Sequence, residues 1–145
     1  MLAVTFSKYP FRLREPEEIF DIVRKKWVAR TPEEWVRQHW IHFLIEQKYP
    51  ASLIAIEHSI KLFDLGKRCD IVIFSKKGNP VLIIECKSNE VKLSQKTMEQ
   101  IGRYNLKLQV PHLIISNGTE HYGFRIDHEK KSWKEISELP LFTDL

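Results

Sequence analysis

The apolar positions of this chain fall into short β-branched runs and a few stretches with helical spacing. Helical spacing predicts helices over about 17–28, 31–47 and 93–108, and a last short helix over Ser132–Leu139. Residues Met1–Pro16 are expected to form an irregular or strand-forming arm. Short apolar runs bounded by turn residues predict strands over Leu53–Phe63, Cys69–Phe74, Val81–Cys86, His112–Ser116 and Glu120–Asp127. This order predicts an α/β fold with a mixed central sheet flanked by helices.

The predicted helix over 31–47 begins with a capping sequence. Thr31 is a good N-cap and Pro32 suits the first helical position. Glu34 stands three residues after Thr31, as in a capping box. Glu34 therefore has a structural role available, which leaves Glu33 as the carboxylate that is freer to turn inward. The positive end of the helix dipole accounts equally well for either glutamate.

Three charged residues stand on the two strands that flank the turn sequence SKKGNP. A turn centred between Lys77 and Gly78 pairs residues whose numbers sum to 155, so that Asp70 lies opposite Glu85. Glu85 and Lys87 are two residues apart, which places them on one face with Cα atoms roughly 7 Å apart. Two carboxylates and an ammonium therefore meet at the end of an apolar hairpin. This arrangement favours a site for a divalent cation with a lysine beside it.

An internal ion pair is the alternative explanation for these charges. Glu85 follows a run of apolar residues typical of a strand covered on both faces, where a carboxylate costs several kcal/mol unless it is paired or binds a metal. Pairing of Lys87 with Asp70 or Glu85 explains the spacing as well as a metal site does. The hairpin register and the segments that follow favour the metal site.

The two cysteines provide a test of the same register. Cys69 and Cys86 also have numbers that sum to 155, so they are expected to face each other on the side of the hairpin away from Asp70 and Glu85. A disulfide is geometrically conceivable, but we expect two reduced, buried thiols. The chain has no CxxC pair, which argues against zinc.

Composition places the chain among ordinary globular proteins. Its 145 residues are 43% hydrophobic and 29% charged, which predicts one domain with its own core. The net charge of +4 is mildly basic and therefore compatible with a nucleic-acid partner. We find no apolar run of about 18 residues and no signal-peptide pattern, so we expect a cytoplasmic protein without a membrane partner.

Several basic and polar side chains are candidates for contacts with a bound nucleic acid. For the run Arg24-Lys25-Lys26, a solvated helix face is favoured over a phosphate contact. Gln100 and Tyr104 lie one turn apart on one face of the predicted helix over 93–108, which follows the Glu85 strand directly. The candidate phosphate contacts near the site are Lys67, Arg68, Lys92, Lys96 and Arg103.

At the level of motifs, the chain resembles the PD-(D/E)XK nuclease superfamily. More closely, it resembles standalone proteins that carry the N-terminal nuclease-like domain of type I restriction enzyme R subunits. The resemblance covers nearly all of the chain from about residue 15, and the segments that carry it are TPEEWVRQ, KRCDIVIF, VLIIECK, EQIGRYN and IISNG. It implies a restriction-endonuclease-like αβββαβ core. Cys69 stands where the superfamily has a proline, and that proline varies. The helicase and translocase portions of a restriction subunit are not in this sequence, so type I restriction by this chain alone is not expected.

The resemblance also implies roles for individual residues. Asp70 and Glu85 would hold Mg²⁺ or Mn²⁺, and Lys87 would assist the attacking water. Glu33 would join them from the helix, and Gln100, supported by Tyr104, would complete a QxxxY motif typical of a subset of these nucleases.

The function expected from the residues and the resemblance together is metal-dependent hydrolysis of nucleic acid, with DNA as the favoured substrate. The alternative is a catalytically inactive nucleic-acid-binding or assembly module that keeps the nuclease fold. We expect one nuclease-like domain over residues 1–145, divided into an N-terminal arm and helix (1–30), a core (31–127) and a C-terminal helix and tail (128–145). A homodimer is left open.

Overall fold

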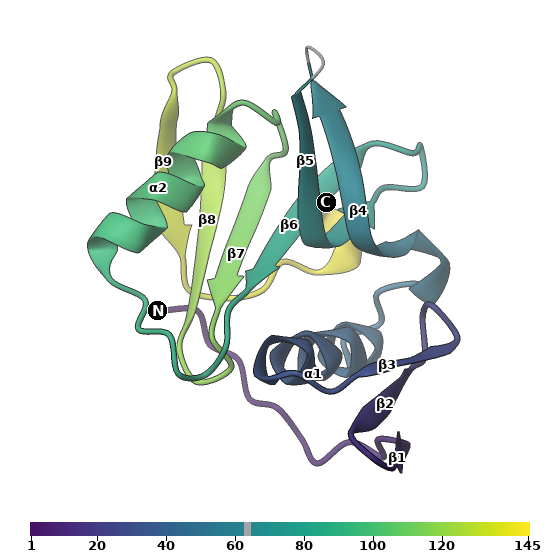
Figure 1. Cartoon of the computed structure of the whole chain (residues 1–145). Coiled ribbons are helices and arrows are strands. Elements are labelled where there is room, and N and C mark those ends of the chain that lie inside the picture. Colours follow the sequence, from purple (N-terminus) through teal and green to yellow (C-terminus); the bar gives the residue numbers. More distant parts are fainter. Residues whose placement is uncertain (63–64) are drawn as a thin grey trace.

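A mixed sheet of six strands forms the centre of the protein in the computed structural model (Figure 1). The structure describes residues 1–62 and 65–145, without the side chains of residues 61–67. The strand order is β4-β5-β6-β7-β8-β9. β6 and β7 are parallel and the other neighbours are antiparallel. The bounds are β4 Ile54–Leu62, β5 Leu65–Phe74, β6 Pro80–Cys86, β7 His112–Ser116, β8 His121–Asp127 and β9 Ser132–Ile136.

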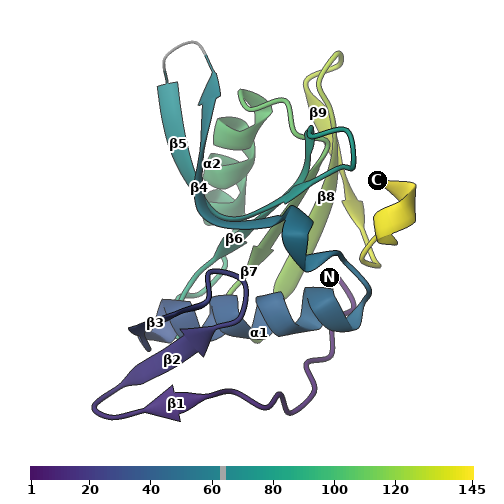
Figure 2. The same ribbon diagram turned by 90° about the vertical axis from the view of Figure 1, so that its right-hand side faces the viewer.

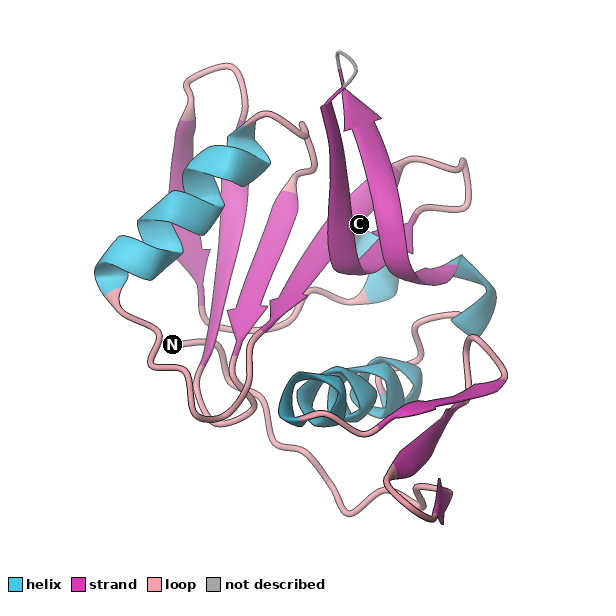
Figure 3. Cartoon of the chain, viewed as in Figure 1, coloured by secondary structure: helices cyan, strands magenta, loops and turns pink. Residues whose placement is uncertain are grey.

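Two helices cover opposite faces of this sheet (Figures 1 and 3). Helix α1 (Pro32–Glu46) packs against one face through Val36, Trp40 and Leu44. Helix α2 (Gln95–Leu106) packs against the other face through partly buried Met98 and Ile101. The element order α1-β4-β5-β6-α2-β7 confirms the predicted αβββαβ core.

The predicted N-cap of α1 is confirmed, and α2 has a cap that the sequence analysis did not predict. The hydroxyl of Thr31 accepts a hydrogen bond from the backbone N–H of Glu34 at 3.1 Å. The hydroxyl of Ser94 does the same for Thr97 at 3.2 Å. Each hydroxyl satisfies a donor that has no partner within its own helix.

The β5–β6 hairpin has the predicted register. Ile71 pairs with Ile84 and Ile73 with Leu82, so the paired numbers sum to 155. The turn itself shifts the pairing by one residue, because Phe74 pairs with Pro80. A β-bulge at this point leaves Val81 as the extra residue and restores the predicted alignment.

Residues 17–28 form strands rather than the predicted helix. β2 (Glu18–Asp21) and β3 (Lys26–Ala29) pair with each other, and β1 (Leu13–Arg14) extends them to a three-stranded sheet beside α1 (Figure 2). The carboxylate of Asp21 accepts the backbone N–H groups of Val23 and Arg24, and Lys25 has a φ of 55°. This side-chain hydrogen bonding favours a tight turn over a continuous helix.

The C-terminal segment also differs from its predicted structure. Ser132–Ile136 forms strand β9 instead of the predicted short helix, because it pairs with β8 over its whole length. Pairing with an existing sheet edge overrides a weak local helical pattern. The arm over Met1–Pro16 is irregular as predicted, apart from β1 and an isolated bridge from Ala3 to Glu138.

Both cysteines are buried thiols outside any disulfide, as predicted, but they do not face each other. Cys86 packs in the core under α1, whereas Cys69 packs in the core under α2. Ile71 also lies in the α1 core, although it is only two residues from Cys69. The alternation of faces in β5 therefore breaks between Cys69 and Ile71.

The strand predicted over Leu53–Phe63 is observed as β4, and Phe63 lies outside the described residues. Within the part of the chain that the structure describes, no helix has the length and apolar character needed to cross a membrane.

Candidate functional site

Asp70 lies where the pairing between β5 and β6 ends. The last paired residues at this end are Ile71 and Ile84. One residue further on, Oδ2 of Asp70 accepts the backbone N–H of Cys86 at 2.8 Å. A carboxylate thus takes the place of a main-chain acceptor on the neighbouring strand. The other oxygen, Oδ1, lies 3.7 Å from Nη2 of Arg37.

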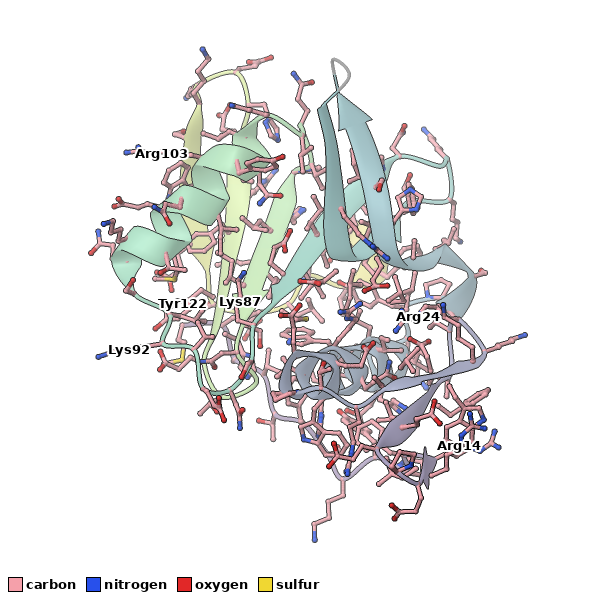
Figure 4. All side chains as sticks on the ribbon, in the orientation of Figure 1. Arg14, Arg24, Lys87, Lys92, Arg103 and Tyr122 are labelled. Carbon is pink, nitrogen blue, oxygen red and sulfur yellow. The ribbon has the colours of Figure 1, made fainter. Side chains whose placement is uncertain are left out.

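Glu85 and Lys87 lie on and just beyond the same end of β6. Ile83 packs in the α2 core, so Glu85, two residues later, lies on the α2 side of the sheet. Glu85 is buried. Lys87 is half-buried, and its backbone N–H donates to the carbonyl of Ser116 at 2.8 Å, which holds the chain beside β7 (Figure 4).

Helix α1 presents two successive glutamates that have different surroundings. Glu33 is half exposed, and burial together with the charge of Asp70 raises the pKa of its carboxyl, while Arg37 and Lys87 act in the opposite direction. Glu33, Asp70 and Lys87 therefore share one electrostatic environment. Glu34 points into the protein and is buried, because its carboxylate pairs with Arg24 and Arg37. The prediction that Glu33 is the glutamate freer to turn inward is therefore wrong.

Arg37 lies at the centre of a buried group of charges that sequence reasoning missed. Its guanidinium lies 3.2 Å from Oε2 of Glu34 and 3.1 Å from Oε1 of Glu57. Only 5% of Arg37 is exposed, so these carboxylates and Asp70 supply most of its polar surroundings. The spacing along α1 could have indicated this role, because Arg37 is three residues after Glu34 and four before buried Ile41, on one face of the helix.

A second arginine joins the N-terminal sheet to this group. Arg24 donates to Asp21 at 2.7 Å and to Glu34 at 2.8 Å, and it lies 3.2 Å from Glu57. Gln38 donates to Asp21 at 2.9 Å. Of the Arg24-Lys25-Lys26 run, Arg24 therefore binds carboxylates in the interior, and only the two lysines are exposed.

Glu57 has a strained backbone at the same place. Its φ of 50° is unusual for a residue other than glycine, and such a conformation costs of order 1 kcal/mol or more. Its carboxylate contacts Arg24, Arg37 and Arg68. Strain of this kind persists where the surrounding contacts outweigh it, and these ion pairs supply such contacts.

The other predicted residues lie on the surface. Gln100 and Tyr104 are exposed on α2, one turn apart as predicted. Lys92, Lys96 and Arg103 are exposed, and Figure 4 shows Lys92 and Arg103 projecting outward. Arg68 is exposed and bound to Glu57 at 2.8 Å. The side chain of Lys67 lies outside the described residues.

Among the side chains that the structure describes, no three His, Cys, Asp or Glu residues form a ready-made metal cluster. Glu85 lies on the α2 side of the sheet, so the structure does not bring all three predicted ligands together. Asp70 and Glu33 are the pair of carboxylates that interact electrostatically on the α1 side, next to Arg37. Mg²⁺ is usually held by one or two carboxylates together with water and substrate phosphates, so this set of oxygen donors fits such an ion.

The fold and this polar strand end define a mixed α/β protein of the nuclease-like class. The chain belongs to the family described as the type I restriction enzyme R protein N terminus, whose model matches residues 32–140.

Two solved structures support the fold. One is the fragment structure of a "putative HsdR subunit of a type I restriction enzyme" from Vibrio vulnificus, with 20% identity and a TM-score of 0.51. The match covers 70% of this chain and 22% of that one, so this chain spans about a fifth of its length. The other is a "putative nuclease belonging to DUF820" from Anabaena variabilis, with 15% identity and a TM-score of 0.52 over 92% of this chain and 88% of that one. A comparison with curated proteins gives no match.

Proposed function

We propose that this protein is a metal-dependent nuclease that hydrolyses phosphodiester bonds, with DNA as the favoured substrate. The observation that carries the proposal is the position of Asp70. Its carboxylate accepts the backbone N–H of Cys86 just after the strand pairing ends, at the same end of β6 where Glu85 and Lys87 lie. Family membership supports the same reading, because it links the chain to restriction enzymes.

Asp70 and Glu85 are the proposed ligands of Mg²⁺ or Mn²⁺, with Glu33 as a third carboxylate. The bound ion would supply Lewis-acid polarisation of the phosphate and a more acidic water. Arg37 limits repulsion among the carboxylates, since its guanidinium lies close to Asp70 and Glu34.

Lys87 is proposed to orient the attacking water or to stabilise the negative charge that develops on the phosphate. The pKa of Glu33 is affected by Lys87, which is consistent with an ammonium that lies near the carboxylates. Gln100 and Tyr104 are proposed to assist from α2. Their exposure leaves them accessible to a bound strand.

The test is a cleavage assay on supercoiled, linear and single-stranded DNA and on RNA, with Mg²⁺, Mn²⁺ or a chelator. We expect cleavage that requires the metal and that falls by at least about 100-fold in Asp70→Ala and Lys87→Ala. Glu129→Ala and Lys130→Ala, in the exposed β8–β9 turn, are the matched controls and should cut normally. Lys87→Ala should retain nucleic-acid binding, because the lysine acts mainly as charge develops.

Two outcomes would contradict the proposal. Cleavage that survives in Asp70→Ala would show that the activity belongs to another site or to a contaminant. Metal-independent binding without any cleavage, under every condition, would identify a binding module that keeps the nuclease fold.

A further inference from the structure

The small sheet formed by β1, β2 and β3 has an outer face that is aromatic and basic. Phe20 and Trp27 are cross-strand partners, with ring centroids 5.4 Å apart. Ile19 and Asp21, which alternate with Phe20 along β2, are buried toward the body of the protein. The two rings therefore lie on the face of the sheet that is turned away from α1.

Two arginines cover these rings. The guanidinium carbon of Arg12 lies 4.5 Å from the ring centroid of Phe20, and that of Arg14 lies 4.4 Å from the ring of Trp27. Both arginines are exposed, and Arg14 also contacts Glu18 at 2.8 Å. A guanidinium that stacks on an aromatic ring is held in place, which suits it to bind phosphate through N–H groups that are not already bonded. In Arg14 the Nε–H is taken by Glu18.

Charge is concentrated in this part of the chain. Residues 8–30 contain seven basic and four acidic residues, a net charge of +3 out of +4 for the whole protein. One of the four acids, Asp21, is buried and already paired with Arg24, whereas Lys8, Lys25 and Lys26 are exposed. Asp21 and Arg24 pair in the interior and cancel, so the rest of this segment keeps the net charge of +3.

The small sheet is fixed next to the candidate active site. Arg24, in the turn between β2 and β3, pairs with Glu34 and Glu57, and these two carboxylates also contact Arg37 beside Asp70. Figure 4 shows Arg24 close to the end of α1 and Arg14 projecting from the small sheet. The family match begins at residue 32, so this sheet lies outside the matched region.

We propose that the outer face of the β1–β3 sheet, built from Arg12, Arg14, Phe20 and Trp27, binds the sugar-phosphate backbone of the DNA beside the candidate active site. This inference rests on the proposed function for the identity of the ligand, but it concerns binding and not cleavage. The arginines contact phosphates, and the rings hold the guanidinium groups in position. The Arg24 ion pairs keep this face at a fixed position relative to Asp70.

The test measures binding of a fluorescein-labelled DNA duplex by anisotropy, with chelator present so that nothing is cut. The variant is the double substitution Arg12→Gln with Arg14→Gln. The matched control is Lys130→Gln with Lys131→Gln, which removes the same charge from the exposed β8–β9 turn. We expect the arginine variant to bind about tenfold more weakly near 100 mM salt and to lower the salt slope by about 2, while the control changes little. Arg12→Lys with Arg14→Lys should recover most of the binding.

Equal weakening of DNA binding in the arginine variant and the control would overturn the proposal, because it would show that binding depends only on the net charge of the protein. Unchanged binding in the arginine variant would also overturn it, as would a wild-type protein that does not bind the duplex. A thermal melt of each variant distinguishes lost binding from lost folding, and the lysine variant tests the charge even if the glutamine variant is destabilised. Arginine-dependent binding without cleavage would support this surface while contradicting the nuclease, so the two proposals fail separately.

Discussion

The two helices use polar side chains in opposite ways. Helix α1 buries Glu34, Arg37 and Gln38 among its apolar residues, whereas α2 exposes Lys96, Gln100 and Arg103. Burial of charge is costly, so α1 must satisfy each charged group with a partner from another element. Those partners come from the small sheet, from β4 and from β5. The comparison shows that α1 helps to build the candidate site, while α2 mainly covers a hydrophobic face.

The largest expected effect is the loss of the central arginine of α1. Arg37→Met should lower the free energy of unfolding by about 3–5 kcal/mol, because it leaves Glu34, Glu57 and Asp70 without their shared cation. The matched change on α2, Arg103→Met, should cost no more than about 0.5 kcal/mol, since Arg103 is exposed. Urea denaturation of both variants measures the difference. Similar losses in the two helices would remove the contrast between them.

A buried histidine against α1 should make stability depend on pH. The ring of His121 meets that of Trp40 edge to face, with centroids 5.5 Å apart, and His121 Nδ1 lies 2.7 Å from the hydroxyl of Ser116. Burial lowers the pKa of His121 to about 4. The unfolded chain takes up a proton near pH 6.5, so this contribution to stability is complete above that pH and is lost as the pH falls toward 4. We expect a loss of about 2 kcal/mol between pH 7 and pH 5.

The check is chemical denaturation across that range for the wild type and His121→Gln. The variant should be less stable at pH 7 and should have a flatter pH profile, while the other histidines titrate equally in both proteins. Parallel profiles would show that His121 does not titrate on unfolding.

The smallest expected effect concerns a feature that the two helices share. Thr31→Ala and Ser94→Ala should each cost about 1 kcal/mol, because each hydroxyl caps one backbone N–H in the same way. Thermal melts of the two variants should therefore give similar shifts. A much larger loss for Thr31→Ala would show that the cap of α1 also holds the buried charges in place.

The sequence predicted most strongly where local pattern and tertiary structure agree. The β5–β6 register follows from the facing runs of apolar residues, because a slip by one residue would turn each strand over. The turn shifts the pairing by one residue, and the bulge at Val81 restores the register in the rest of the hairpin. The prediction was wrong for residues 17–28, where apolar residues with nearly helical spacing belong to a hairpin. There the carboxylate of Asp21 accepts two backbone N–H groups and stabilises a turn. The spacing of apolar residues does not indicate this turn.

The sequence by itself determined the αβββαβ order, the N-cap of α1 and the register that pairs Ile71 with Ile84 and Ile73 with Leu82. These features depend on local spacing and on which faces must be buried. Tertiary structure alone decided that Arg37 contacts Asp70, Glu34 and Glu57, that Arg24 ties the small sheet to α1, and that the two cysteines lie in different cores. An ion pair between distant segments leaves no periodic signal, because each partner reads as an ordinary polar residue until the fold brings the two together.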